Sequence, residues 1–395
     1  MILLPQEQSQ LRRSIQGFEK MGARILVLGV KVPFTSGGQD ALMRSLVREL
    51  AARGHTVDTI ELPFVVEPKE QLINQAALWR AWDFGRFGGQ PVDLLIATKF
   101  PSYYARGAIK SVWLVHEHRA MYDLYASRFS DFSDDARDEA LREILTEGDK
   151  RMLAECDYRA AISNNVAQRV KTFHGLQCAT LYPPLPLGNQ YRFNSQPGNA
   201  SSDAYVLSVG RICSIKRVDV MLKAMPYITS GVTLKIVGTP DEPGIMQYLQ
   251  NEIAAHNISS RVEFLGRVSD EKLLELYANC LCVYYAPLDE DYGYVTLESM
   301  ASGKPVIAGT DSGGVLEFVR DRENGLVIQA TSENVALAVN ELAANPALAE
   351  KLGRNGRALV QDLGFTQRGW DDVINGLLSP LSSNSFTVSL PGSTA

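Results

Sequence analysis

Two consecutive series of short apolar runs, each alternating with segments of helical periodicity, constrain what this chain can fold into. The first series starts at residues 24–30, a run rich in β-branched residues, and the next segment, 39–53, has apolar residues at helical spacing. The second series starts at residues 205–209. Strands that alternate with helices favour a parallel sheet covered on both faces. The sequence therefore predicts an α/β protein with two doubly wound parallel-sheet domains.

The same patterns place the individual elements. The first series predicts strands at 24–30, 56–62, 93–97, 111–115 and 159–162, and helices at 39–53, 134–156 and 164–173. The second series predicts strands at 205–209, 233–237, 262–265, 281–285 and 305–308. Ser163 is expected to cap the helix that follows it, because a serine hydroxyl can accept a bond from a free amide of the first turn.

A change of composition separates the two series. Residues 184–203 are rich in proline, glycine, asparagine and serine, which is typical of an interdomain linker. We therefore expect a first Rossmann-like domain at 23–183, a linker at 184–203 and a second Rossmann-like domain at 204–365. Three further segments complete the predicted organisation, an N-terminal extension at 1–22, a C-terminal helix at 366–378 that packs back toward the first domain, and a flexible tail at 379–395.

Composition and charge exclude several classes of protein. Hydrophobic residues make up 45% of the 395 residues and charged residues 21%, which is ordinary for a soluble globular protein. The net charge of -6 argues against a nucleic-acid partner, and no apolar run reaches the ~20 residues needed to cross a bilayer. The five cysteines form no C-x-x-C pair, which predicts reduced thiols in the cytoplasm. A disulfide scaffold, a collagen, a transmembrane transporter and a disordered chain are excluded.

Two cations follow the first strand of the second series. Arg211 and Lys216 lie five residues apart, directly after Gly210, where the strand turns into the next helix. Positive side chains beside a helix N-terminus suit a diphosphate group. A solvated basic loop is the alternative interpretation of this motif taken alone.

Two carboxylates, Glu290 and Glu298, lie eight residues apart around a second strand-to-helix turn. Gly293 allows a tight backbone there, and the amides that begin the helix favour an anion. Glu298 could accept bonds from ribose hydroxyls, and Glu290 could reach a sugar hydroxyl. The alternative is an acid stabilised by the helix dipole together with one surface glutamate.

With these two motifs the sequence resembles the large retaining glycosyltransferase family called group 1, or family 4. The resemblance covers roughly residues 23–378 and implies the GT-B fold, in which two Rossmann-like domains face each other across a cleft. It also implies that the domain at 23–183 binds the acceptor and that the domain at 204–365 binds the nucleotide sugar. Further landmarks of the family occur in the expected order. These are Gly37-Gly38, His116-Glu117, Ser163, Tyr182-Pro183-Pro184 and Gly303-Lys304-Pro305-Val306.

The resemblance implies a role for each matching position. The implied catalytic residues are Arg211, Lys216, Glu290 and His116. The implied donor-binding residues are Gly37, Gly38, Gly210, Gly266, Arg267, Val268, Tyr292, Gly293, Tyr294, Val295, Thr296 and Glu298. His118 and Arg119 are expected on the acceptor side, although a structural histidine and a plain salt bridge are the alternatives for them.

We expect the reaction to need no metal ion and no other cofactor. Arg211 and Lys216 can stabilise the departing diphosphate, so we interpret the D-x-D at Asp289 and Asp291 as a non-metal feature. Retention is usually described as front-face attack, in which the acceptor hydroxyl enters on the side from which the phosphate leaves. No second carboxylate is then needed as a nucleophile, unlike in retaining glycosidases.

The expected function is transfer of a hexose-type sugar from a UDP- or GDP-linked donor to a hydroxyl of a saccharide or lipid-linked acceptor. We expect a role in bacterial surface polysaccharide or glycoconjugate synthesis, in the cytoplasm or at the inner face of the plasma membrane through peripheral contact. A sugar-nucleotide epimerase on the same fold and a non-catalytic sugar- or nucleotide-binding protein are the alternatives. A nicotinamide enzyme is disfavoured, because neither first strand is followed by G-x-G-x-x-G.

Overall fold

The computed structural model describes residues 22–33, 37–107, 109–193, 204–229, 231–365 and 369–383. Almost all of the predicted N-terminal extension, half of the predicted linker and the last twelve residues of the predicted tail lie outside these ranges. The chain divides into two compact units, which we describe separately. The first comprises the described residues of Met1–Ala126, Phe132–Ala160 and Ile374–Ala395, and the second those of Ser127–Asp131 and Ala161–Val373.

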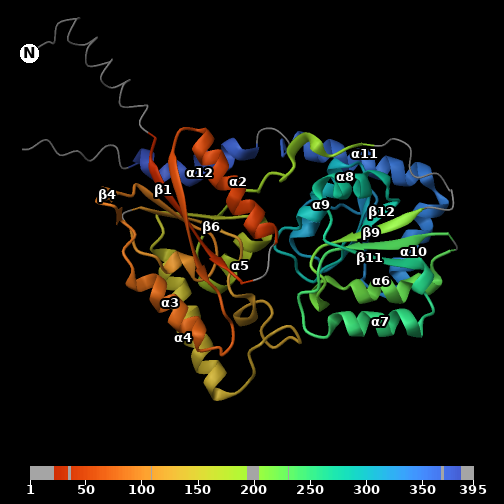
Figure 1. Ribbon diagram of the computed structural model, residues 1–395, viewed down its shortest axis with the longest axis horizontal. Coiled ribbons are helices and arrows are strands. Elements are labelled where there is room, and N and C mark those ends of the chain that lie inside the picture. The colour runs from red at the N-terminus through yellow and green to blue at the C-terminus, as the bar shows by residue number, and fades with distance from the viewer. Residues whose placement is uncertain are drawn as a thin grey trace, which may run out of the picture. The chain divides into compact units, whose positions relative to one another are not determined.

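The first sheet has six strands in the order β2-β1-β5-β6-β7-β8 (Figure 1). Its strands are β1 Arg24–Lys31, β2 Thr56–Pro63, β5 Leu94–Ala97, β6 Lys110–Leu114, β7 Tyr158–Ala161 and β8 Ala179–Thr180. β1 is parallel to both β2 and β5, and β5 is parallel to β6. Six consecutive residues of β1 are buried, as expected for a strand that is covered on both faces.

The helical segments between these strands include the three predicted at 39–53, 134–156 and 164–173, together with others that were not predicted. They are α2 Gly38–Ala52, α3 Gln71–Ala81, η1 Ser102–Tyr104, η2 Arg119–Met121, α4 Ala136–Ala154 and α5 Asn164–His174, and a small hairpin pairs β3 Arg86–Phe87 with β4 Gln90–Pro91. Leu42, Leu46 and Leu50 form the buried face of α2. The predicted cap of α5 is confirmed, because the Ser163 hydroxyl accepts a bond from the Val166 amide at 3.0 Å.

The second sheet also has six strands, in the order β11-β10-β9-β12-β13-β14, and each neighbouring pair is parallel. Its strands are β9 Tyr205–Val209, β10 Thr233–Val237, β11 Val262–Gly266, β12 Cys282–Tyr284, β13 Val306–Gly309 and β14 Gly325–Ile328. β9 and β10 have the predicted bounds. The edge strand β14 was not predicted, since its four residues begin with a glycine.

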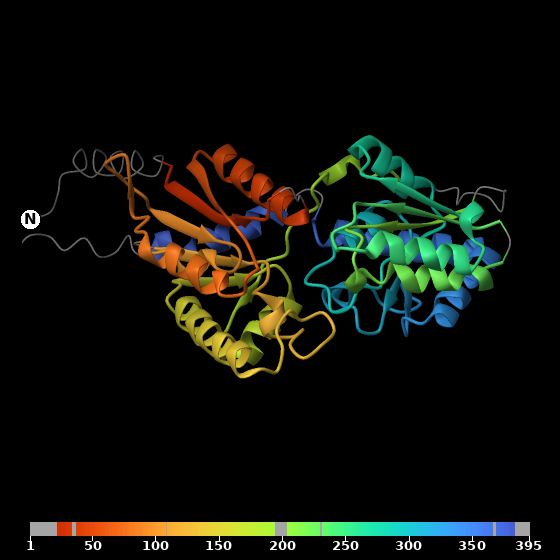
Figure 2. The same cartoon turned by 60° about the horizontal axis from the view of Figure 1, so that its bottom comes forward.

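Helices cover both faces of the second sheet. The α-helices between β9 and the C-terminal helix are α6 Val218–Ala224, α7 Ile245–Ala255, α8 Asp270–Asn279, α9 Tyr294–Ala301, α10 Ser332–Ala344 and α11 Pro346–Asp362. The short 3-10 segments η3 Gly188–Gln190, η4 Ser214–Lys216, η5 Met225–Tyr227, η6 Ser259–Arg261 and η7 Gly314–Glu317 lie in the connections. α10 packs against α6, and α11 packs against α9 on the other face (Figure 1). Figure 2 shows the green helices α6 and α7 side by side. The predicted doubly wound arrangement is confirmed.

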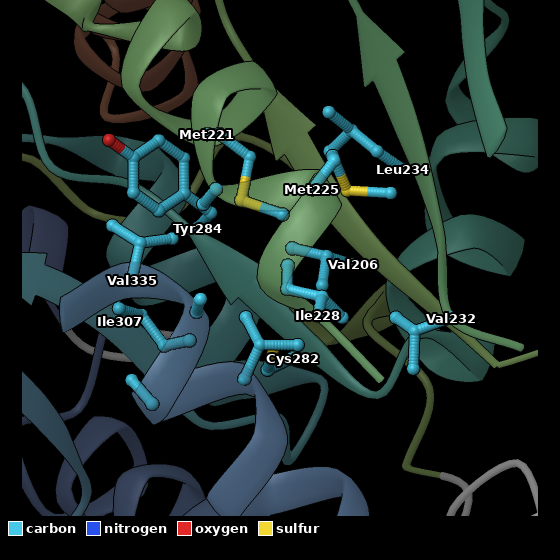
Figure 3. Packing of buried hydrophobic residues seen from close by; sticks show 14 of the residues in the cluster. Val206, Met221, Met225, Ile228, Val232, Leu234, Cys282, Tyr284, Ile307 and Val335 are labelled. Atoms are coloured by element: carbon cyan, nitrogen blue, oxygen red, sulfur yellow. The ribbon is translucent and has the colours of Figure 1, made fainter. Parts of the chain in front are cut away.

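The core of the second unit lies between β9, β12, β13 and the helices α6 and α10. Figure 3 shows Val206, Cys282 and Ile307 of the strands gathered with Met221 of α6 and Val335 of α10, and none of these side chains is exposed. Burying a side chain of this size contributes about 1.5–3 kcal/mol. This packing fixes the strands from whose carboxyl ends the candidate site is built.

The C-terminal helix α12 runs Gly369–Ser383 and contributes residues from Ile374 onward to the first unit. There the Ser111 hydroxyl donates to the carbonyl of Leu377 at 2.8 Å. The predicted start of the tail at residue 379 is too early, because the helix continues through Pro380. None of the helices in the described ranges combines the length and hydropathy that crossing a bilayer requires.

Candidate active site

Three adjacent strands of the second sheet end in glycines, Gly210 after β9, Gly238 after β10 and Gly266 at the end of β11. Their backbones are close. The Gly238 amide donates to the Gly266 carbonyl at 2.9 Å, and a Cβ on Gly238 would lie 1.8 Å from the Gly210 carbonyl oxygen. With a φ of +148° as well, Gly238 accepts no larger residue. The carboxyl edge of the sheet is thus bare backbone, which a ligand can approach closely.

Acidic side chains hold the basic loop that follows β9. Arg211 forms an ion pair with Asp241, and its side chain remains 55% exposed. The amide and the hydroxyl of Ser214 each donate to the Glu242 carboxylate at 2.7 Å. The predicted cation Arg211 is therefore accessible to a ligand. Its acidic partner, which lies 30 residues further along the chain, was not predicted.

Lys216 and Glu290 form a direct ion pair, although 74 residues separate them. Both side chains are largely buried, at 15% and 18% exposure. The Lys216 ammonium also donates to the Tyr285 hydroxyl at 3.3 Å. Burial raises the pKa of that tyrosine far above its ordinary value, so the hydroxyl is neutral. The structure therefore brings the predicted diphosphate cation and the predicted sugar-binding carboxylate to one point.

The turn into α9 has the tight backbone predicted at Gly293. Its φ is +85°, and a Cβ would lie 3.0 Å from a methyl of Val315. The Thr296 amide donates to the Gly293 carbonyl at 3.0 Å. The Thr296 amide is thus already bonded within the turn. The amides of Tyr294 and Val295 are therefore the stronger candidates for binding phosphate.

Tyr292 precedes this turn and is buried. Its hydroxyl donates to the Pro183 carbonyl at 2.6 Å, and its ring packs against Tyr294 and Phe318 with centroids 5.2 and 5.5 Å away. These contacts make Tyr292 a packing residue of the loop, and donor binding by its side chain stays a prediction.

Two tyrosine hydroxyls donate to the carboxylate of Glu298. The Tyr277 hydroxyl lies 2.7 Å from one oxygen, and the Tyr191 hydroxyl lies 3.3 Å from the other. Burial raises the pKa of Glu298 above its ordinary value, whereas the tyrosine bonds lower it. The carboxylate is thus fixed in one orientation. Neither tyrosine was predicted, because nothing in the sequence links either one to the motif.

The D-x-D carboxylates are bound by other side chains. Asp289 accepts a bond from the Asn165 side-chain amide at 2.7 Å, and Asp291 accepts one from the Arg169 guanidinium at 2.8 Å. Within the described ranges, the structure groups no three His, Cys, Asp or Glu side chains in a way that could hold a metal ion.

Arg267 and Val268, predicted near the nucleotide base, directly follow Gly266 of β11. The Arg267 side chain is exposed and Val268 is half-buried. Their position at the carboxyl edge of the sheet agrees with the predicted location, and their contact with a base stays a prediction.

The remaining predicted histidines and Arg119 belong to the first unit. The Nδ1 atom of His116 lies 2.5 Å from the Glu117 carbonyl oxygen. The His118 ring packs among three phenylalanines, with centroids 6.1 to 6.2 Å away. Arg119 forms the alternative salt bridge, to Asp123. His116 is thus oriented by the backbone, while His118 and Arg119 have structural contacts, and their part in acceptor binding stays a prediction.

The glycine pair at the start of α2 also lies in the first unit. Gly37 has a φ of -154°, an extended conformation open to any residue, and no atom lies within 4 Å of a Cβ built on it. Its amide donates to the Asp40 carboxylate at 2.8 Å. Gly37 is thus not required by strain or crowding within this unit, and Gly38 is the first helical residue. Their approach to a donor stays a prediction.

Comparison with known proteins supports the predicted resemblance. Residues 190–359 match the family model described as Glycosyl transferases group 1. The chain is 36% identical over 117 residues to the alpha-1,3/1,6-mannosyltransferase ALG2 of Dictyostelium discoideum, which covers 30% of this chain and 28% of that protein. It is 30% identical over 265 residues to the D-inositol 3-phosphate glycosyltransferase of Nocardia farcinica, which covers 63% of this chain and 57% of that protein. The match thus spans less than two thirds of either relative.

Solved structures share the fold over most of the chain. Sucrose-phosphate synthase from Thermosynechococcus elongatus superposes with a TM-score of 0.71 at 20% identity, over 93% of this chain and 100% of that one. WaaG, a glycosyltransferase involved in lipopolysaccharide biosynthesis, gives 0.66 at 16% identity, over 89% and 98%. Anabaena HepE in complex with UDP and glucose gives 0.64 at 16% identity, over 88% and 99%. The predicted resemblance to group 1 glycosyltransferases is therefore confirmed, since residues 190–359 match that family and both parallel-sheet α/β domains are those of the GT-B fold.

Proposed function

We propose that the chain is a retaining hexosyltransferase that moves a hexose-type sugar from a nucleoside diphosphate sugar to a hydroxyl group. The pairing of Lys216 with Glu290 carries the proposal. A sugar–phosphate bond placed alongside this pair has a cation beside the leaving phosphate and a carboxylate beside the hydroxyls of the sugar. The two groups come from loops after different strands, β9 and β12, so the fold and not the local sequence brings them together.

Breaking the bond between the sugar and the diphosphate develops negative charge on the leaving group. Lys216 and the exposed Arg211 supply fixed positive charge for it, and the first amides of α9 add hydrogen-bond donors. One preorganised donor of this kind contributes about 10²–10³-fold to the rate. Fixed side chains thus meet the electrostatic demand of the reaction, and we propose that it proceeds without a metal ion.

Retention is proposed to follow front-face attack. Retaining glycosidases use two carboxyl groups about 5 Å apart, one of them as a nucleophile. Here the carboxylates on either side of Glu290 are bound by Asn165 and Arg169. In the proposed step the acceptor oxygen forms a bond to the anomeric carbon, the bond from that carbon to the phosphate oxygen breaks, and the hydroxyl proton passes to the departing phosphate.

Glu298 suits the ribose of the donor. It is an acceptor fixed by two tyrosines, at the helix that follows the proposed diphosphate position. A structure of the same fold is known with UDP and glucose, and one sequence relative is named a mannosyltransferase. We therefore propose a UDP-hexose donor first and a GDP-hexose donor second.

The acceptor is proposed to be a saccharide or lipid-linked hydroxyl compound used in surface polysaccharide or glycoconjugate synthesis. A fold neighbour involved in lipopolysaccharide biosynthesis supports this class, and a relative named for D-inositol 3-phosphate supports a hydroxyl compound as the acceptor. We propose that the reaction takes place in the cytoplasm, with peripheral contact at the plasma membrane if the acceptor is lipid-linked.

The proposal is tested first by binding and then by turnover, both in EDTA. UDP, GDP, ADP, CMP and dTDP are compared for their effect on the melting temperature, since a ligand at 100 times its Kd adds about 2.7 kcal/mol to stability. The nucleotide that binds then selects the sugar donor for a transfer assay, with the anomeric configuration of the product read by NMR. A changed nucleotide sugar without an acceptor would indicate the epimerase, and binding without turnover would indicate the non-catalytic protein.

A further inference from the structure

The first turn of α5 is bonded to the loop that carries Glu290. The Asn165 side-chain amide donates to the Asp289 carboxylate at 2.7 Å and to the Glu290 carbonyl at 3.1 Å. The Ser163 hydroxyl donates to the carbonyl of Asp291. All of these residues lie in the second unit. Three consecutive loop residues are thus held by one helix end that is more than 120 residues distant in sequence.

A buried cation of the same helix fixes the two carboxylates that flank Glu290. The Arg169 side chain is only 4% exposed, and its Nη1 donates to Asp291 at 2.8 Å. Its Nη2 lies 3.6 Å from the Asp289 carboxylate. Burying a guanidinium is costly unless its charge is matched, and the two aspartates supply negative charge next to it. Glu290 between them is left to pair with Lys216.

The backbone of this loop is also held in an unusual conformation. Asp289 has a φ of +42°, which a residue with a side chain rarely adopts. The Glu290 carbonyl additionally accepts the Gly314 amide at 2.7 Å. Such strain persists only where the surroundings enforce it, and it occurs frequently at functional sites. The contacts with Asn165 and Arg169 supply that enforcement on the side chain of Asp289.

The helix end is itself anchored by Glu317. The amides of Asn164 and Asn165 donate to its carboxylate at 3.0 and 2.7 Å, and the Tyr182 hydroxyl donates to it at 2.7 Å. A carboxylate at a helix N-terminus is stabilised by the helix dipole. Glu317 therefore fixes the backbone position of Asn165. The side chain of Asn165 in turn bonds to the Glu290 carbonyl, so the contacts link Glu317 to Glu290 through Asn165.

We infer that Asn165 and Arg169 are positioning residues for sugar transfer, acting through Asp289 and Asp291 to hold the Glu290 carboxylate beside Lys216. The inference rests on the proposed function, because it assigns to α5 a part in that reaction. Misplacing a reacting group by about 1 Å can cost 10²-fold in rate. Loosening this loop should therefore lower kcat, while binding of a nucleoside diphosphate, which has no hexose for Glu290 to contact, should change little.

The test compares Asn165→Ala with Gln168→Ala, a substitution of an exposed residue on the same helix. In the full chain, Asn165→Ala should lower kcat at least 10-fold and change the Kd of UDP or GDP less than 3-fold, while Gln168→Ala changes neither. Arg169→Lys keeps the charge but loses the fixed guanidinium geometry and should give an intermediate kcat. It also provides a second variant if Asn165→Ala does not fold.

A double-mutant cycle with Glu290→Gln separates positioning from a general structural effect. If Asn165 acts through Glu290, then Asn165→Ala should cost less than 3-fold in kcat when Glu290→Gln is already present. An equal loss in both backgrounds, or an unchanged kcat in Asn165→Ala, would overturn the inference and leave the proposed function intact. A wild-type chain that neither binds a nucleoside diphosphate nor turns over a nucleotide sugar would overturn both.

Discussion

Replacing Lys216 by alanine tests the electrostatic basis of the proposed reaction most directly. The substitution removes the ammonium group that pairs with Glu290 and donates to Tyr285. It leaves Arg211 in place, because that residue is paired separately with Asp241. The structure therefore allows one of the two proposed phosphate cations to be removed while the other keeps its partner.

The expected loss of activity follows from the role of a preorganised donor. Losing one such group costs about 10²–10³ in kcat, or about 2.7–4 kcal/mol of transition-state stabilisation. The effect on folding should be smaller. With exposures of 15% and 18%, the pair with Glu290 lies between a surface pair, about 0–1 kcal/mol, and a buried pair whose loss costs about 3–5 kcal/mol. We expect a loss of about 1–3 kcal/mol, which a domain of ordinary stability survives.

The assay measures kcat and KM with the nucleotide sugar that supports turnover, together with the free energy of unfolding in urea. Lys223→Ala is the matched control, because Lys223 pairs with Asp219 on α6 and is 36% exposed. It should keep wild-type kcat. A Lys216→Ala variant with kcat within 3-fold of wild type would refute the diphosphate assignment. A variant that is inactive because it is unfolded would show that Lys216 acts mainly through stability.

Three further predictions concern other parts of the protein. Gly238→Ala should destabilise the protein by about 3 kcal/mol or more, because the new Cβ would collide with the Gly210 carbonyl oxygen. Gly231 has a φ of +98° but open space around it, so Gly231→Ala should cost only about 1 kcal/mol. Urea unfolding measures the loss of stability in both variants. Tyr277→Phe removes one of the bonds to Glu298 and should raise the Kd of the nucleoside diphosphate about 5-fold, with pyrophosphate binding unchanged in calorimetry. Burial raises the pKa of the Asp149 carboxyl from 3.8 to about 7. Between these two pH values the carboxyl is protonated in the folded protein and ionised in the unfolded chain. Stability should fall by on the order of 4 kcal/mol as the pH rises from about 4 to 7 and then level off, and Asp149→Asn should abolish this fall in unfolding experiments at pH 5 and 8.

The sequence predicts the architecture well where one buried run forms one central strand. β9 and β10 have the predicted bounds, because apolar residues fill them and polar residues or glycines end them. The prediction fails at the edges. β14 is a four-residue strand that begins with glycine, and the signal of so short a run cannot be distinguished from that of a loop. The end of α12 was assigned to the tail because it is rich in serine and contains a proline. Composition alone does not show whether packing against the rest of the protein stabilises such a segment as a helix.

The candidate site divides along a different line. Lys216 and Glu290 were predicted because each belongs to a short motif at a strand end, where ligands bind in this fold class, and because the two motifs together resemble those of group 1 glycosyltransferases. The residues that hold these groups in place were not predicted, because they come from segments distant in the sequence. Tyr277 on α8 fixes Glu298, and Asn165 on α5 fixes the loop of Glu290, across 21 and 125 residues. No periodicity links such pairs, and an asparagine in the first turn of a helix is ordinary in itself. Motifs therefore predict the groups that would touch a substrate, whereas the groups that fix their geometry become visible only once the chain is folded.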